Sequence, residues 1–276
     1  VRECCGDYPA VFGWELGGLE TGADRSIDDV PFAEITRLLC AAYGRGAVNT
    51  VSWHPQNPES GASAWDGKTS TAVSSILPGG ANHAQFRLWL DRLAGFFVGL
   101  KSADGTCVPV LFRPFHEHTG SGFWWGEAQC TPDEYKALWR FTVEYLRDVK
   151  GVHNLLYVYS PDLYRDAEHY TERYPGDEWV DVLGLDAYHR PQDWDFLSGG
   201  ERMLSTLGHE HGKPTAFTET GLEGIPDTAW WTRRLLPVIR GKGLSYVLVW
   251  RNAHDRPTHF FGPWHGHASE PDFRTF

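Results

Sequence analysis

The sequence contains no long hydrophobic run: no stretch of it approaches the roughly 20 apolar residues of a membrane-spanning helix. Its first residues, Val1-Arg2-Glu3, do not have the pattern of a signal peptide. Positive charge is also scarce, because 25 Lys and Arg stand against 36 Asp and Glu and leave a formal net charge of −11. Phosphate backbones repel a protein this acidic, so the composition argues against a nucleic-acid partner as well as a membrane span.

Cysteine is sparse and odd in number. The five cysteines are Cys4, Cys5, Cys40, Cys107 and Cys130. Their spacings match none of the patterns that bind zinc. One or two disulfides would suit an exported protein, whereas buried free thiols would suit any compartment. The sequence therefore leaves the state of the cysteines open.

Several catalytic signatures are missing as well. The sequence has no Walker A motif, no G-x-G-x-x-G fingerprint for dinucleotides and no G-x-S-x-G elbow. The stretches His116-Glu117-His118 and His209-Glu210-His211 are not His-Glu-x-x-His, so the two imidazoles would not share one face of a helix. We interpret the second stretch as the end of a surface helix and predict no metal site.

What the sequence does contain is a series of short apolar runs, each ending in polar or aromatic residues and separated by helix-like stretches. Near-continuous apolar strands alternating with helices predict a parallel sheet that is covered on both faces. The seven expected strands are residues 9–16, 49–55, 108–115, 154–160, 180–186, 214–219 and 244–250.

The intervening helices have recognisable starts and periodicity. Thr131 is a suitable N-cap and is followed by Pro132 and two acids, which predicts a helix over residues 135–149. Pro237 is expected to end or kink the last predicted helix. The other expected helices are residues 32–43, 86–100 and 230–239.

Strand count decides the fold class. A (β/α)8 barrel needs eight strands. The tail after Trp250 is rich in Pro, His and Gly and is expected to be loop, and the segment before Pro9 is too short for a strand and a helix. We predict an α/β fold, a (β/α)8 TIM barrel, as a single domain over residues 1–276 with the first β/α unit missing from this sequence. An open seven-stranded sheet would leave two apolar edges to be covered.

The expected strand ends share a chemical character. Barrel enzymes carry catalytic residues at the carboxyl ends of their strands. One polar residue there would be an ordinary loop anchor, but six such strand ends predict a shared functional face. The polar and aromatic residues at these ends are His54, His116, Glu117, Ser160, Asp162, Asp186, Tyr188, Glu219, Trp250 and Arg251.

Two of these residues suit glycosidic cleavage, which needs one protonated and one ionised carboxyl group. Glu117 and Glu219 follow apolar strands, where burying a charged group costs free energy. Acids at such positions therefore suggest a function. Arg113 is placed to contact one carboxylate, and Tyr188 is placed to donate its hydroxyl to the nucleophile. Tryptophans such as Trp124 follow Glu117 and are the type of side chain that stacks on sugar rings.

At these residues the chain resembles glycoside hydrolase family 26, chiefly β-mannanases, a family of retaining (β/α)8 enzymes. The resemblance runs over nearly the whole sequence, and its motifs are specific in combination although each alone is weak. The matching stretches are residues 6–16, 52–54, 112–117, 123–126, 174–188, 218–221 and 249–252. One departure is Gly122, where family members commonly carry Trp, which predicts an altered subsite preference.

The resemblance implies a role for each candidate. Glu117 would be the acid/base at the end of the fourth strand, and Glu219 the nucleophile at the end of the seventh, if one strand precedes Pro9. Tyr188 would orient Glu219, and Arg113 would support the carboxylates. The implied sugar-binding residues are His54, Trp65, His116, Trp124, Asp186, Trp250, Arg251 and His259.

The leading prediction is a retaining endo-β-1,4-mannanase that hydrolyses mannan, glucomannan or galactomannan as a monomer without metal or cofactor. Because such a polymer is met outside the cytoplasm, we expect a secreted, periplasmic or cell-surface location. Three alternatives remain: the same fold acting on mixed-linkage β-glucan or β-1,3-xylan, an exo-acting mannobiohydrolase, and a non-catalytic carbohydrate-binding protein. The pair Glu117 and Glu219 argues against the last.

Overall fold

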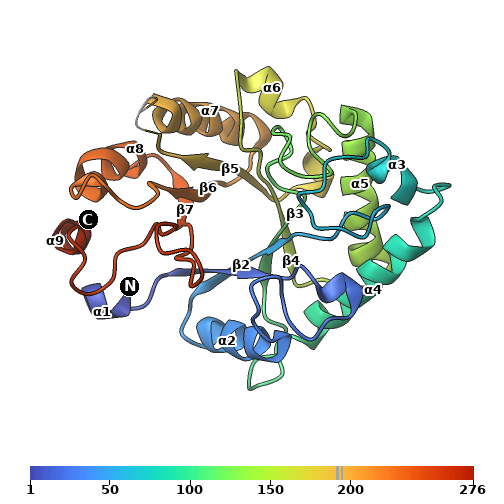
Figure 1. Ribbon diagram of the computed structural model, residues 1–276, viewed down its shortest axis with the longest axis horizontal. Coiled ribbons are helices and arrows are strands. Elements are labelled where there is room, and N and C mark those ends of the chain that lie inside the picture. Colours follow the sequence, from blue (N-terminus) through green and yellow to red (C-terminus); the bar gives the residue numbers. More distant parts are fainter. Residues whose placement is uncertain (191–192, 194) are drawn as a thin grey trace. The chain divides into compact units, whose positions relative to one another are not determined.

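The computed structural model describes residues 1–190, 193 and 195–276, over which strands alternate with helices (Figure 1). The chain divides into two compact units. Phe12–Val182 forms the first, here called the N-terminal unit. Val1–Val11 and Leu183–Phe276 form the second, here called the C-terminal unit. Within the described residues, no helix is long and apolar enough to cross a membrane.

Four strands lie in the N-terminal unit in sequence order: β1 (Val11–Glu15), β2 (Val48–Trp53), β3 (Val110–Pro114) and β4 (Leu155–Tyr159). The strands β2, β3 and β4 pair in parallel, and all five residues of β3 are buried. The helical segments of this unit are η1 (Leu19–Thr21), α2 (Phe32–Gly44), α3 (Ala72–Ile76), α4 (His83–Gly99), α5 (Pro132–Glu144), η2 (Tyr145–Val149), α6 (Ala167–Thr171) and η3 (Asp177–Trp179).

The start of α5 follows the prediction. The Thr131 hydroxyl accepts a hydrogen bond from the backbone N–H of Glu134, and the Glu134 carboxylate accepts one from the backbone N–H of Thr131. This reciprocal pair satisfies two amide groups that have no acceptor inside the helix. The predicted helix continues to Val149, but its last turn, η2, is a π-helix.

The C-terminal unit contains β5 (Val182–Tyr188), β6 (Thr215–Gly221) and β7 (Leu244–Val249), again parallel and in sequence order. All seven residues of β6 are buried. Register shifts occur after Leu185 in β5 and between Phe217 and Thr220 in β6, and such bulges change the direction in which nearby side chains point. The helical segments are α1 (Arg2–Cys5), α7 (Asp195–His211), η4 (Trp231–Leu235), α8 (Leu236–Ile239) and α9 (Glu270–Thr275).

One local expectation in the C-terminal unit needs correction. The helical run of η4 and α8 stops at Ile239, as expected, two residues after Pro237 and just after the change from π- to α-helix. The tail after Trp250, however, is not entirely loop, because it ends in α9, which has a proline in its first turn and packs against α1.

All seven predicted strands are present, each within a few residues of its expected bounds. Parallel strands in sequence order, connected through helices, are the repeating unit of the α/β TIM barrel. The predicted fold class is therefore confirmed, with seven strands among the described residues where a complete barrel has eight.

Candidate active site

The turn after β3 carries Glu117 on a strained backbone. Phe115 and Glu117 have φ values of 49° and 53°, which are uncommon for residues other than glycine. Strain of this kind persists only where the surroundings impose it, and it often marks functional sites. Three hydrogen bonds hold the turn: Tyr135 Oη to Phe115 O at 2.9 Å, Trp125 Nε1 to His116 O at 2.8 Å, and Glu117 N to Ser160 O at 2.8 Å.

Arg113 lies in β3, two residues before this turn begins. Its side chain is only 3% exposed, and its Nη1 donates to Ser160 Oγ at 3.2 Å. Asp162, also in the loop after β4, accepts hydrogen bonds from Thr119 Oγ1 and the Gly120 N–H, both at 2.9 Å. Burial raises the pKa of Asp162. Arg113 and Asp162 therefore tie the loop after β4 to β3 and to its following turn.

A carboxylate that the sequence reasoning missed lies at the end of β1. Glu15 Oε2 is 2.7 Å from His54 Nδ1 and accepts a hydrogen bond from Ser52 Oγ at 2.6 Å. Burial acts to raise the pKa of Glu15, but the charge of His54 and hydrogen bonds from His54, Ser52 and the Gly17 N–H outweigh it and lower the pKa to about 2. The sequence did contain a signal for Glu15, because this residue is an acid near the end of the first expected strand.

The Glu15 contact determines how His54 is presented. A carboxylate beside Nδ1 places a ring proton on that nitrogen. The ring of His54 stacks on Trp65 at a centroid distance of 5.2 Å and meets His116 edge-on at 4.5 Å. Trp65 is 55% exposed, so its indole offers a flat apolar surface to solvent.

The tryptophans that follow Glu117 do not offer such a surface. Trp124 is 0% exposed, and its Nε1 donates to Pro55 O at 3.0 Å. Trp125 is equally buried and packs edge-on against Trp124 and against Phe115. The expectation that Trp124 contacts sugar is therefore corrected: its ring belongs to the core beneath the loop, because none of it is exposed.

His116 is buried beside this aromatic core. Burial, followed by the positive charge of Arg113, lowers the pKa of His116 well below its usual range. Its Nδ1 has no hydrogen-bond partner among the described residues. The ring also lies 5.3 Å from that of Phe123. Burial therefore favours the neutral imidazole of His116.

In the C-terminal unit, Glu219 lies within β6 and is 3% exposed. Tyr188, the last residue of β5, donates its hydroxyl to Glu219 Oε2 at 2.6 Å. Asp186 is opposite Glu219 in the strand register, and its Oδ1 accepts a hydrogen bond from Thr218 Oγ1 at 2.6 Å. The bulge before Asp186 brings these side chains to adjacent positions on neighbouring strands.

The loop after β7 holds the remaining candidates of this unit. The half-buried Trp250 donates its backbone N–H to Thr220 O at 3.0 Å, and the half-buried Arg251 follows it. His259 Nδ1 is 2.7 Å from Glu223 Oε1 in the loop after β6. The His259 ring meets Phe261 edge-on, and Phe261 lies beside Tyr188. This packing connects His259 to the end of β5.

Each unit thus gathers its own candidates at or just beyond the carboxyl ends of its strands or in the following loops. The N-terminal unit carries His54, Trp65, Arg113, His116 and Glu117. The C-terminal unit carries Asp186, Tyr188, Glu219, Trp250, Arg251 and His259.

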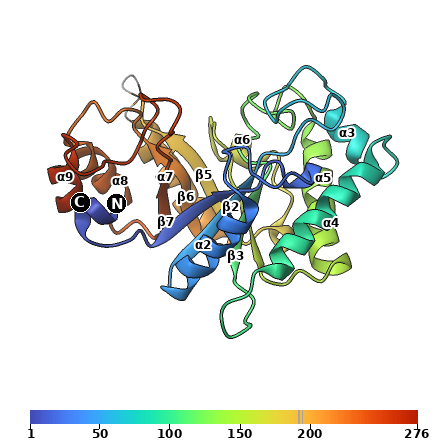
Figure 2. The same ribbon diagram turned by 60° about the horizontal axis from the view of Figure 1, so that its bottom comes forward.

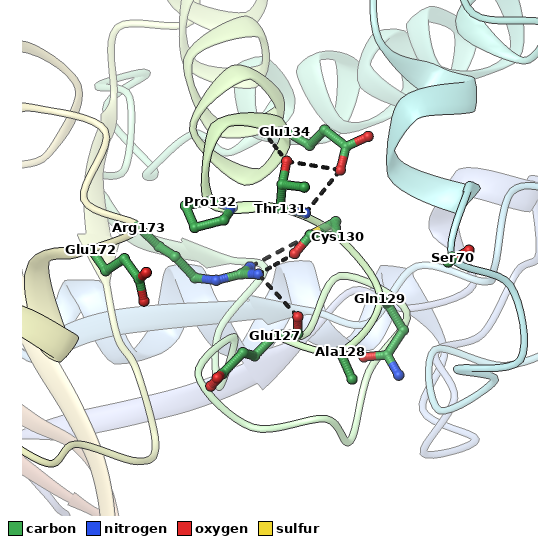
Figure 3. Close-up of a pocket in the computed structure, with 10 residues that line it drawn as sticks. All are labelled: Ser70, Glu127, Ala128, Gln129, Cys130, Thr131, Pro132, Glu134, Glu172 and Arg173. Carbon is green, nitrogen blue, oxygen red and sulfur yellow. Dashed lines mark hydrogen bonds between the residues drawn. The ribbon is translucent and has the colours of Figure 1, made fainter.

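A separate pocket of about 460 Å³ lies in the N-terminal unit, between the loop around Glu127 and the residues Glu172 and Arg173 (Figure 3). The buried guanidinium of Arg173 donates to the backbone carbonyls of Glu127 and Cys130 at its inner side. No candidate residue lines this pocket, and its one buried cation is occupied in holding the loop. It is therefore not the candidate active site.

Comparison with known proteins identifies the family. The model of glycosyl hydrolase family 26 matches residues 1–202. The chain belongs to glycosyl hydrolase family 26. It is 47% identical to a solved family 26 β-mannanase from Bacteroides ovatus, with a TM-score of 0.97 over 100% of this chain and 80% of that one.

Two curated relatives are mannan endo-1,4-β-mannosidases. The alignment with the enzyme of Bifidobacterium adolescentis is 305 residues long and shows 36% identity. It covers 100% of this chain and 30% of the relative. The chain is 32% identical to the enzyme of Bacillus subtilis over 239 residues, which cover 83% of this chain and 61% of the relative. The chain therefore spans only part of the length of each of these relatives.

Proposed function

We propose that residues 1–276 form one catalytic domain, that of a retaining endo-β-1,4-mannanase. The observation that carries the proposal is the 2.6 Å hydrogen bond from Tyr188 to Glu219, which holds a buried strand-end carboxylate in one orientation. A nucleophile needs such a fixed orientation, because a small error in the approach to the reacting carbon lowers the rate strongly. The names of the relatives support mannan as the substrate.

The two glutamates differ in setting, and the difference supports their roles. Glu219 is buried and held by Tyr188, as suits a group that bonds to the sugar. Glu117 is half-buried on the turn after β3. This more open position suits an acid that must give a proton to the leaving oxygen and later take one from water.

In the proposed mechanism, Glu219 attacks the anomeric carbon while Glu117 protonates the departing glycosidic oxygen. The bond from the anomeric carbon to that oxygen breaks as the bond to Glu219 forms. Glu117 then takes a proton from a water molecule, whose oxygen displaces Glu219 and releases the sugar. Double displacement of this kind operates with carboxyl groups about 5–5.5 Å apart and needs no metal or cofactor.

The remaining candidates are proposed as the sugar-binding surface. Trp65 provides an exposed aromatic face, and the ring of His54, held by Glu15, stacks on it. Arg113 supports the turn that carries Glu117 through its contact with Ser160. The other proposed contacts are His116, Asp186, Trp250, Arg251 and His259.

The chemistry of the substrate extends the proposal. Mannan, glucomannan and galactomannan are polymers found outside the cytoplasm, so we infer that the protein acts after export, as a secreted, periplasmic or cell-surface enzyme. We infer that it acts as a monomer and has no nucleic-acid partner, in keeping with its net charge of −11.

The test is hydrolysis of galactomannan and glucomannan beside barley β-glucan and β-1,3-xylan, with product sizes and anomeric configuration followed from the first minutes. Mixed manno-oligosaccharides that are released first as the β-anomer support the proposal. Mannobiose as the sole product would show that the enzyme is exo-acting and not endo-acting. Cleavage of only glucan or xylan would contradict mannan as the substrate. Release of the α-anomer would exclude retention, and binding without cleavage would make the protein a carbohydrate-binding module.

A further inference from the structure

Lys101 and Cys107 form an unusually close pair, away from the candidate active site. The Lys101 Nζ is 2.7 Å from Cys107 Sγ. Seven other hydrogen bonds that involve sulfur, all among the described residues, have lengths from 3.3 to 3.7 Å. A length of 2.7 Å is normal when the acceptor is oxygen, but sulfur is a larger atom. Nitrogen and sulfur are therefore closer here than an ordinary hydrogen bond would bring them.

A tight hairpin between α4 and β3 holds the two residues in place, and it projects below β3 in Figure 2. Lys101 and Cys107 are partners in an isolated antiparallel bridge, so their side chains leave the same face of the hairpin. Ser102 N–H donates to Thr106 O at 2.9 Å, which closes the next rung.

The tip of the hairpin is equally well ordered by hydrogen bonds. Asp104 Oδ1 accepts from Ser102 Oγ and from the Thr106 N–H, and Gly105 takes the left-handed backbone conformation with φ of 84°. Short polar side chains and a glycine at such positions favour a turn before any tertiary contact forms. The pair is therefore preorganised by its own hairpin.

Both side chains of the pair are exposed, so a small oxidant reaches them without any opening of the fold. A second thiol lies nearby: Cys40 on α2 donates to the backbone carbonyl of Lys101 at 3.3 Å. Access and proximity to a reaction partner decide which cysteines are oxidised, and oxidation begins with a sulfenic acid, in which an oxygen atom is already bonded to sulfur. For Cys107 the neighbour in contact is an amine.

We propose that Lys101 and Cys107 are an oxidative modification site, at which their side chains become joined through one oxygen atom as an N–O–S bridge. Hydrogen peroxide is the oxidant. The first peroxide converts the thiol to a sulfenic acid and leaves one water. The second removes the hydrogen of that S–O–H group and one hydrogen of the neutral amine as the N–O bond forms, and leaves two waters. The sulfur and the nitrogen each lose two electrons, and the two peroxide molecules accept all four. One of the four peroxide oxygens stays in the bridge, and three leave as water. A thiol reductant reverses the linkage and restores the amine and the thiol.

The test is mass spectrometry of the whole protein, reduced and then treated with hydrogen peroxide. The bridge adds one oxygen and removes two hydrogens. Peptide mapping should locate this change in a cross-linked fragment that contains Lys101 and Cys107, with tryptic cleavage after Lys101 blocked. Treatment with dithiothreitol should return the original mass and restore cleavage.

Three variants separate the bridge from other oxidation products. Lys101→Arg keeps the positive charge but has no primary amine, and Cys107→Ser has no sulfur; both should lose the product. Cys40→Ser should retain it. Loss of two hydrogens without added oxygen, located in a peptide linking Cys40 to Cys107, would overturn the proposal in favour of a disulfide. A cross-link between Lys101 and Cys107 that lacks the added oxygen would be a sulfenamide and would overturn the proposal. Oxygen added to Cys107 without a cross-link, or no reaction at that residue, would also overturn it.

Discussion

Glu15 at the end of β1 and His54 at the end of β2 are in direct contact, with 2.7 Å between the Glu15 Oε2 and His54 Nδ1 atoms. The ionised form of Glu15 is favoured, since its pKa is lowered from an ordinary value of 4.5 to about 2. A carboxyl group whose pKa is lower in the folded than in the unfolded state stabilises the fold above the unfolded pKa. That stabilisation is lost as the pH falls through the folded pKa.

The first prediction follows from the direction in which the pKa of Glu15 is shifted. The shift of Glu15 from 4.5 to about 2 corresponds to about 3 kcal/mol of the free energy of unfolding, present at pH 6 and lost progressively between pH 4.5 and 2. Urea denaturation of the wild type and Glu15→Gln should show a stability difference that shrinks over this range. A difference that does not change with pH would contradict the assignment.

The second prediction concerns Tyr188. Removing its hydroxyl in Tyr188→Phe deletes the 2.6 Å hydrogen bond to Glu219 while keeping the ring against Phe261. A hydrogen bond to a charged group contributes about 1.5–3 kcal/mol, so kcat on manno-oligosaccharides should fall by about 10- to 100-fold. The melting temperature should change little. An unchanged kcat would show that Tyr188 does not orient the nucleophile.

The third prediction tests the two glutamates. Glu219→Gln should abolish measurable turnover, because an amide does not form the glycosyl-enzyme bond. Glu117→Ala should lower hydrolysis of polymers by about 10²- to 10⁴-fold, the usual contribution of a general acid. With an aryl mannoside whose leaving group needs no proton, the first step should be spared and the glycosyl-enzyme should accumulate, because its hydrolysis still needs Glu117 as the base. Glu178→Gln, an exposed carboxylate in η3, is the matched control and should retain full activity. Normal turnover in both active-site variants would remove these residues from the mechanism.

The fourth prediction separates two tryptophans by what their loss affects. Trp65→Ala should raise KM with little change in stability, because the ring is 55% exposed. Trp124→Ala should lower the free energy of unfolding by about 3–5 kcal/mol, as expected for a fully buried aromatic ring. Thermal denaturation and steady-state kinetics on both variants check this. The reverse pattern would restore Trp124 as a sugar contact.

The fifth prediction concerns Gly122, at which the resemblance leads us to expect a departure from the family. The residue is exposed, and a Cβ there would meet no atom within 4 Å, so a larger side chain fits. Gly122→Trp should lower KM for longer manno-oligosaccharides by about fivefold, since one stacked ring contributes on the order of 1 kcal/mol. Gly122→Ala is the control and should leave KM unchanged. Equal KM values in all three proteins would show that no sugar reaches this loop.

The strands of this protein could be predicted from its sequence because their signal is local. Each of the seven expected strands is an apolar run that ends in polar or turn residues, and the structure has a strand in every run. The start of α5 at Thr131 is local in the same way, since the capping residues lie within four positions of one another. The family motifs added the candidate glutamates, which the structure places in β6 and just after β3.

Tertiary structure decided which side chains are buried and which meet. Glu15 and His54 are 39 residues apart, and Trp124 is enclosed by partners as distant as Pro55, so no local pattern distinguished a paired acid or a core tryptophan from a sugar contact. The backbone of the Glu117 turn likewise depends on Tyr135, Trp125 and Ser160. Local sequence determines where a strand begins and ends, whereas burial and pairing depend on residues that only folding brings into contact.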